Sequence, residues 1–334
     1  MSNIAKAFAN GKAFIPFVTC GDPDLETTAK VVRAMAQAGA DLIELGIPFS
    51  DPTAEGPVIQ EANVRALAAG TTTDKIFDLV RDLRRDVTIP MVFMTYANVV
   101  FSYGAEKFIS TCADIGIDGL ILPDIPYEEK DEFDPICKRY GVDLISMAAP
   151  TSENRIAMIA REATGFLYIV SSLGVTGVRS EITTDIDAIV RLVRESTPIP
   201  RAVGFGISTP EQARNMAELS DGAIVGSAIV KLIACYGRDA APPCGGLCQR
   251  NERRGAFCLI RRNSHEKNHC SAGRPDAGRI PDRLRRRTDR LHSSRGGNRC
   301  TGREFHSLCR EERIRYDALS LLYHHQPNGG LPTG

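Results

Sequence analysis

The feature that most constrains this chain is an alternation of short apolar runs with longer amphipathic runs, which extends from residue 12 to residue 230. The alternation has a coarse period of about 25–30 residues. The apolar runs are rich in β-branched residues and are typical of strands buried on both faces. They cover residues 13–19, 41–47, 90–96, 118–124, 143–149, 166–172, 201–207 and 222–227.

Amphipathic helix patterns fill the intervals, for example at residues 25–39, 73–85, 104–116 and 208–219. Several of them open with Thr or Ser at the capping position and stop at Gly. Strands that are each followed by a helix predict a parallel sheet covered by helices, and eight such units predict a closed (β/α)8 TIM barrel. A doubly wound open sheet is the alternative. It is disfavoured because no GxGxxG turn follows the first strand.

Charge divides the chain into two regions, although its 41 basic and 41 acidic residues balance overall. Residues 1–234 carry 21 Lys/Arg and 31 Asp/Glu, whereas residues 235–334 carry 20 and 10, with all six histidines and seven of the ten cysteines. The second region has no lasting periodicity and too few large apolar residues to offset chain entropy. We therefore expect a catalytic barrel at 1–234 and a disordered or out-of-frame extension at 235–334. Such an extension would leave the eighth helix incomplete.

The extension allows two other interpretations. Cys244, Cys248, His265 and His269 form C-x3-C and H-x3-H pairs that resemble a small zinc site, although the sixteen residues between the pairs are a long gap. The excess of arginine would also bind nucleic acid without sequence preference. The acidic first region gives no reason to expect specific nucleic-acid binding.

The sequence contains no uninterrupted apolar run of about 18 residues and no signal-peptide pattern at its start. We therefore expect no membrane span and a cytoplasmic location, where the cysteines would remain thiols.

Two acidic residues lie close together in the segment IELGIPFSDPTAEGP at residues 43–57. Glu44 is inside an apolar strand, and Glu55 follows in a loop rich in Pro and Gly. Buried carboxylates are costly unless they are paired or used in chemistry. Because barrel catalytic residues gather at the carboxyl ends of strands, the pair predicts acid–base catalysis. In the alternative interpretation, Glu44 forms a salt bridge at the edge of a strand and Glu55 is a solvated residue of the loop.

Glycines recur at the ends of the last three strands, in SSLGVTG, GFGIST and GSAIV. In a barrel these loops form a phosphate cradle from backbone N–H groups, which Gly allows to approach a ligand closely. Gly177, Gly206, Gly226 and Ser227 are the expected phosphate-binding residues, with Ser227 also capping a short helix.

Together these motifs resemble the tryptophan synthase alpha subunit family from about residue 5 to residue 234. The matching segments are residues 16–24, 44–60, 94–104, 118–129, 148–156, 174–179, 203–213 and 220–233.

The resemblance implies retro-aldol cleavage of indole-3-glycerol phosphate to indole and glyceraldehyde 3-phosphate, a lyase reaction. It assigns proton transfer to Glu44, stabilisation of the indole N–H to Glu55, and an orienting role to Tyr168. An aromatic residue of the core is an equally good interpretation of Tyr168. The family has Asp where this chain has Glu55. The extra methylene would move the carboxylate by about an ångström, enough to cost roughly 10²-fold in rate.

The resemblance also predicts the walls of the site. Phe17, Met94 and Tyr96 would line the indole pocket, although ordinary core packing explains them nearly as well. Thr176 would sit in a lid that hydrogen-bonds to Asp51. No metal is expected.

The resemblance implies a heterotetramer of two alpha and two beta subunits, with no cofactor in this chain and pyridoxal phosphate in the beta partner. The loops at residues 50–57 and 124–129 are the expected partner face. The alternative is an impaired alpha-like chain that binds the beta subunit without catalysis.

Overall fold

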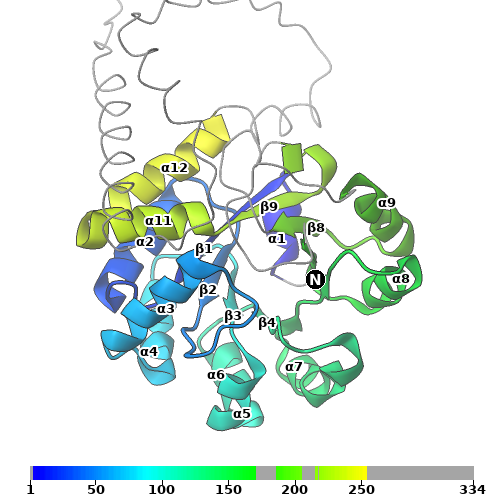
Figure 1. The fold of residues 1–334 in the computed structure, drawn as a ribbon, viewed down its shortest axis with the longest axis horizontal. Coiled ribbons are helices and arrows are strands. Elements are labelled where there is room, and N and C mark those ends of the chain that lie inside the picture. Colours follow the sequence, from blue (N-terminus) through cyan, green and yellow to red (C-terminus); the bar gives the residue numbers. More distant parts are fainter. Residues whose placement is uncertain (1–2, 171–185, 205–214, 217, 254–334) are drawn as a thin grey trace, which may run out of the picture. The chain divides into compact units, whose positions relative to one another are not determined.

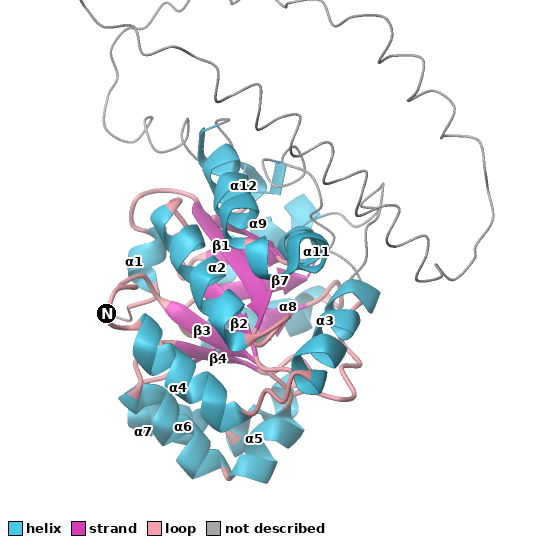
Figure 2. Ribbon diagram, turned by 90° about the vertical axis from the view of Figure 1, so that its left-hand side faces the viewer, coloured by secondary structure: helices cyan, strands magenta, loops and turns pink. Residues whose placement is uncertain are grey.

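The computed structural model of the chain describes residues 3–170, 186–204, 215–216 and 218–253. All of these residues belong to one compact unit, Met1–Ser264. Strands lie at the centre of this unit and helices surround them (Figure 1). The view turned by 90° shows the same enclosure of the strands by helices (Figure 2).

The strands form a single parallel sheet within the described part of the chain. Their order is β5-β4-β3-β2-β1-β9-β8-β7-β6. Each strand lies inside one of the segments that the apolar runs predict. The strands are β1 (Ala13–Thr19), β2 (Ile43–Gly46), β3 (Met91–Met94), β4 (Gly119–Ile121), β5 (Asp143–Leu144), β6 (Met147–Ala148), β7 (Leu167–Val170), β8 (Arg201–Gly204) and β9 (Gly222–Val225).

The two ends of this sheet, β5 and β6, are parts of one predicted strand at residues 143–149. On one side, the Ile145 N–H donates to the Leu120 carbonyl beyond β5. On the other side, the Tyr168 N–H donates to the Ser146 carbonyl just before β6. Because the same short segment pairs with β4 and with β7, it joins the sheet edges and closes the barrel. The prediction of a (β/α)8 barrel is confirmed.

The helices begin where the sequence supplies caps. The Asp24 carboxylate accepts a hydrogen bond from the Thr27 N–H at the start of α2, and the Thr72 hydroxyl accepts one from the Lys75 N–H at the start of α4. The described helices are α1 (Ala5–Phe8), α2 (Leu25–Gln37), α3 (Pro57–Ala68), α4 (Thr73–Leu83), α5 (Ala97–Tyr103), α6 (Ala105–Asp114), α7 (Asp134–Tyr140), α8 (Glu153–Glu162), α9 (Ile186–Ser196), α11 (Ser227–Tyr236), α12 (Ala241–Arg253) and the 3-10 turns η1 (Tyr127–Glu132) and η2 (Gly237–Asp239).

Side chains that alternate along the strands fill the barrel interior in layers. Phe17 of β1 is in register with Glu44 of β2, and Glu44 is in register with Val92 of β3. Residues side by side in parallel strands point to the same face, so Glu44 shares the interior with Phe17 and Val92. Both apolar neighbours belong to the buried core cluster. The Glu44 carboxylate therefore stands between two apolar neighbours.

The C-terminal part of the described chain differs from the sequence prediction. Helix α11 runs through residue 234, and α12 continues the regular structure to Arg253. In Figure 1, α12 lies beside α2 and α11 on the outside of the barrel. The structure therefore describes a helix at residues 241–253, where the sequence predicts no regular structure. Residues 254–334 lie outside the described part.

Close packing explains how a helix forms from the unpromising sequence APPCGGLCQRNER. Pro242 and Pro243 fall in the first turn, where the missing N–H groups are not needed. Gly245 faces α2 so closely that a Cβ atom would come within 3.3 Å of the Ala34 carbonyl oxygen. Cys244 and Cys248 are buried. The helix is thus held by a tight contact that its sequence pattern does not reveal.

The zinc interpretation of the extension stays a prediction. Burial raises the pKa of both the Cys244 and the Cys248 thiol. His265 and His269 lie outside the described residues.

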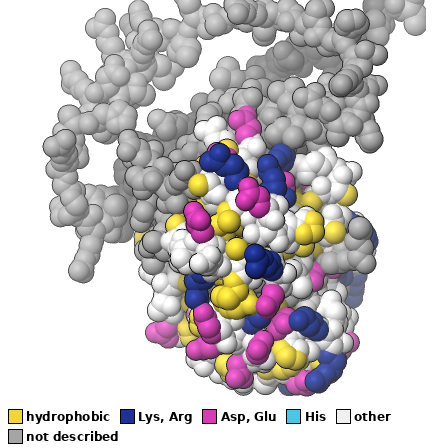
Figure 3. All heavy atoms as spheres, turned by 90° about the vertical axis from the view of Figure 1, so that its right-hand side faces the viewer, with side chains coloured by type: hydrophobic (Ala, Val, Ile, Leu, Met, Phe, Trp, Pro, Cys, Tyr) yellow, Lys and Arg dark blue, Asp and Glu magenta, His cyan; other side chains and the backbone are white. Residues whose placement is uncertain are grey.

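None of the helices that the structure describes is long and apolar enough to cross a membrane. On the face in Figure 3, acidic and basic side chains are interspersed among neutral and apolar ones.

Candidate active site

Glu44 is almost completely buried, with 1% of its surface exposed. Its Oε2 atom has no hydrogen-bond partner among the described residues. Burial, together with the negative charge of Glu55, raises the pKa of Glu44 to about 8. A carboxyl group with this pKa exchanges its proton near neutral pH, as a general acid or base must.

Glu55 lies in the loop between β2 and α3 and is 6% exposed. The Asn63 side-chain amide of α3 donates a 2.7 Å hydrogen bond to the Glu55 carboxylate. Burial raises the pKa of Glu55 to about 7, although the hydrogen bond from Asn63 opposes the rise. Asn63 stabilises the ionised form of Glu55, whereas Oε2 of Glu44 has no partner among the described residues, so ionisation is favoured at Glu55.

The main chain beside Glu55 is held at two further points. The Ala54 N–H donates to the Tyr96 hydroxyl over 2.9 Å. The Gln60 side-chain amide donates to the Glu55 carbonyl over 2.8 Å. The Tyr96 ring also stacks on Phe49, with ring centroids 5.1 Å apart. The loop that carries Glu55 is therefore attached to both α3 and the start of α5.

Tyr168 lies on β7, across the interior from β2. Its phenol covers Gly204 of β8, where a Cβ atom would come within 2.3 Å of the hydroxyl oxygen. Burial raises the pKa of Tyr168 well above its usual value, and the charge of Glu44 raises it further. The phenol is therefore neutral and close enough to Glu44 to sense its charge.

Phe17 and Met94 belong to the same interior cluster as Tyr168. The Phe17 ring lies against Gly46, where a Cβ atom would come within 2.6 Å of the ring. Gly46 therefore makes room for an aromatic wall next to Glu44. Tyr96 is buried too, but its hydroxyl contacts the Glu55 loop, a contact that the sequence does not indicate.

Only part of the expected phosphate cradle can be located. Gly226 is the N-cap of α11 and lies beside Phe17, and Ser227 is the first residue of that helix. No side-chain hydrogen bond caps α11, so the prediction that Ser227 caps it was wrong. The remaining amides of a helix N-terminus attract anions. Gly177 and Gly206 lie outside the described residues.

Asp51 is exposed and accepts a 2.6 Å hydrogen bond from the Ser50 hydroxyl. Its expected lid partner, Thr176, lies outside the described residues. Asp124 lies just after β4, and both of its carboxylate oxygens accept a hydrogen bond from the Ala97 N–H, each over 3.1 Å. It fixes the start of α5 and so the position of Tyr96.

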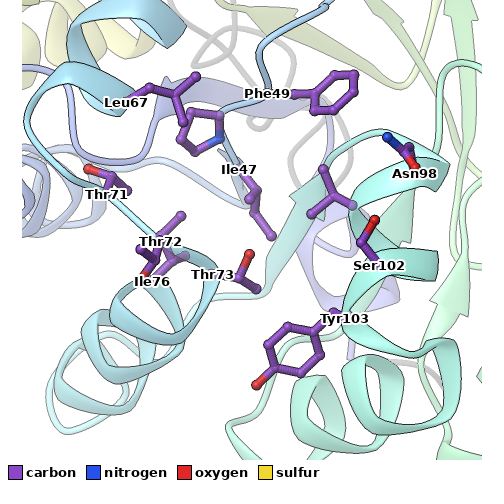
Figure 4. Close-up of a pocket in the computed structure, with 12 residues that line it drawn as sticks. Ile47, Phe49, Leu67, Thr71, Thr72, Thr73, Ile76, Asn98, Ser102 and Tyr103 are labelled. Carbon is purple, nitrogen blue, oxygen red and sulfur yellow. The ribbon is translucent and has the colours of Figure 1, made fainter.

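A surface hollow of about 380 Å³ lies beside the loop between β2 and α3. Figure 4 shows side chains from three segments around it, with Phe49 after β2, Thr71 and Thr72 before α4, and Tyr103 of α5. No group of three or more His, Cys, Asp or Glu residues within the described ranges could hold a metal ion.

The sequence did not single out Asn63, Gln60 or the pair formed by Asp22 and Arg65. Arg65 of α3 binds both carboxylate oxygens of buried Asp22 over 2.7 and 2.8 Å, which fixes α3 to the loop after β1. One sequence signal could have indicated two of them: Gln60 and Asn63 are three residues apart and so share a helix face. Only the fold shows that this face meets Glu55.

Comparison with known proteins agrees with this geometry. The family model described as "Tryptophan synthase alpha chain" matches residues 4–243. The chain belongs to the tryptophan synthase alpha chain family. Its function is that of the alpha-subunit lyase in tryptophan biosynthesis. The match extends past residue 234, where the sequence motifs end, and includes the start of α12.

Relatives named tryptophan synthase alpha chain share about half of their residues with this chain. The protein from Lacticaseibacillus casei is 52% identical over 234 residues, which cover 70% of this chain and 88% of the relative. The protein from Caldanaerobacter subterraneus subsp. tengcongensis is 52% identical over 223 residues, covering 67% and 85%.

Solved structures show the same fold. The tryptophan synthase subunit alpha from Legionella pneumophila str. Paris is 36% identical, with a TM-score of 0.70, and covers 77% of this chain and 98% of its own. The tryptophan synthase complex from Pyrococcus furiosus contains a chain that is 34% identical, with a TM-score of 0.66 and coverage of 72% and 98%.

Proposed function

We propose that Glu44 and Glu55 divide the chemistry of cleaving indole-3-glycerol phosphate between them. The observation that carries this proposal is the pair of buried carboxyl groups with pKa values raised to about 8 and about 7. Between these values Glu44 keeps its proton while Glu55 is ionised. One acid is then a proton donor and the other a fixed negative charge.

In the proposed reaction, protonated Glu44 delivers its proton to indole C3. The ring nitrogen acquires positive charge, which the Glu55 carboxylate stabilises through the indole N–H. The bond between C3 and the glyceryl carbon breaks, its electron pair returns to the ring, and the glyceryl hydroxyl loses its proton to the Glu44 carboxylate. The products are indole and glyceraldehyde 3-phosphate, and Glu44 ends as it began.

The other site residues have supporting roles in this proposal. Tyr168 orients Glu44 with a neutral hydroxyl, and Phe17, Met94 and Tyr96 enclose the indole. The N-terminus of α11 at Gly226 and Ser227, together with Gly177 and Gly206, receives the phosphate. Asp51 and Thr176 close the lid. Alpha chains of this family need no cofactor, since pyridoxal phosphate belongs to the beta subunit.

We place the beta-subunit contact on the loops at residues 50–57 and 124–129, which follow the carboxyl ends of β2 and β4. The proposed location is the cytoplasm, because the six cysteines in the described part are free thiols. The barrel domain is proposed to end with α12.

Indole release from indole-3-glycerol phosphate, with and without the beta subunit, tests the proposal. Activity that Glu44→Gln abolishes supports it. A chain that binds the beta subunit but releases no indole would instead be a non-catalytic partner. This outcome is worth testing because the chain has Glu55 at a position where Asp is expected.

A further inference from the structure

Among the residues that the structure describes, one side chain, Asn63, hydrogen-bonds to the carboxylate of Glu55. Asn63 is 4% exposed and Glu55 is 6% exposed, so their 2.7 Å hydrogen bond is shielded from water. A hydrogen bond to an ionised acceptor is stronger and shorter than one between neutral groups. The acceptor here is a carboxylate, so the amide presents its N–H₂ group to it.

The helix that carries Asn63 is itself well anchored. It begins at Pro57 directly after the Glu55 loop, and Arg65 ties it to buried Asp22 by two hydrogen bonds. Asn63 therefore projects from a rigid element, whereas Glu55 lies in a loop. The Asn63 amide is therefore a fixed point that can hold the Glu55 side chain in position.

We infer that Asn63 is a positioning residue that holds one oxygen of Glu55 and directs the other toward the substrate. The inference rests on the proposed role of Glu55. It also explains how the chain accommodates Glu where the family has Asp: the longer side chain is drawn toward α3 instead of extending into the indole pocket.

The titratable groups facing Glu55 are Glu44 from β2 and Tyr96 from the start of α5, since both respond to its charge. Neither is a cation. The hydrogen bond from Asn63 lowers the pKa of Glu55 and opposes the rise caused by burial. Without this bond, Glu55 would hold its proton to a higher pH, and the acid limb of the pH profile would move upward.

A double-mutant cycle on the full chain tests this inference, with indole-3-glycerol phosphate as substrate. Asn63→Leu keeps the approximate size but cannot donate. We expect kcat/KM to fall by about 10- to 100-fold, the cost of a misplaced catalytic group, and the acid limb to move to higher pH. Combined with Glu55→Gln, the same Asn63→Leu change should have little further effect.

Two variants serve as controls. Gln60→Leu removes a bond to the Glu55 main chain and should leave the acid limb in place. Glu61→Gln alters an exposed residue of the same helix and should leave the kinetics unchanged. If Asn63→Leu lowers the folded fraction, Asn63→Asp provides a second probe, because two adjacent carboxyl groups must raise the acid limb.

Equal losses from Asn63→Leu with and without Glu55→Gln, or an unmoved acid limb, would overturn the inference. If Glu55→Gln alone has no effect, the proposed role of Glu55 fails instead. The two failures are therefore distinguishable.

Discussion

Glu44 and Glu55 carry the same functional group, yet the structure treats them differently. Glu44 stands on a strand between two apolar neighbours, and one of its oxygens has no partner within the described part of the chain. Glu55 stands in a loop, where three hydrogen bonds fix its carboxylate and neighbouring main chain. An unpartnered carboxyl group is suited to exchange a proton, and a bonded one to remain charged. The contrast shows how one residue type acquires two roles from its surroundings.

The largest effect is expected at Glu44. Glu44→Gln keeps the size of the side chain but cannot transfer a proton, so kcat for indole release should fall by about 10²- to 10⁴-fold. Steady-state kinetics measure this fall, with Glu61→Gln as the exposed control. Undiminished activity would show that Glu44 has no part in proton transfer.

The same substitution should stabilise the fold in a pH-dependent way. Because burial raises the pKa of Glu44 from 4.5 to about 8, the folded state resists its ionisation. The parent chain therefore loses stability relative to Glu44→Gln as the pH rises from about 5 to 8. Urea unfolding at several pH values measures the difference. If the free energy of unfolding changed with pH in the same way for both proteins, Glu44 would ionise in the folded state at little cost in stability.

A change far from both acids should affect stability without affecting their titration. Gly245→Val places a side chain against Ala34 of α2, so the free energy of unfolding should fall by about 1–3 kcal/mol. Thermal unfolding measures this loss, and the pH limbs of the activity should stay in place. An unchanged melting temperature would contradict the packing of α12.

The smallest effect is expected at Tyr96. Tyr96→Phe removes the acceptor for the Ala54 N–H, a bond worth about 0.5–1.5 kcal/mol. We expect kcat/KM to fall by roughly 2- to 10-fold, since the Glu55 loop is less well held. Identical kinetics would show that α3 alone positions Glu55.

Much of the barrel follows from its sequence, because parallel strands buried on both faces produce continuous apolar runs. The run at residues 13–19 coincides with β1. The run at 143–149 becomes two short strands, because the segment must pair with a different neighbour at each end to close the barrel. Local pattern carries no information about such closure.

The two acids could also be selected from sequence, since an acid in an apolar strand is unusual. The residues that hold these acids in place could not be selected from the sequence. Asn63 resembles any polar residue of a helix until the fold brings it to Glu55. Helix α12 was missed for a similar reason: its Pro and Gly residues predict no helix, and its stability comes from contact with α2.

The pH dependence of kcat/KM for indole release tests the division of roles most directly, because it reports the ionisation of the free enzyme. We predict a bell-shaped profile with an acid limb near pH 7, where Glu55 ionises, and a basic limb near pH 8, where Glu44 loses its proton. Glu55→Gln should remove the acid limb. A profile that is level between pH 5.5 and 9 would contradict the account.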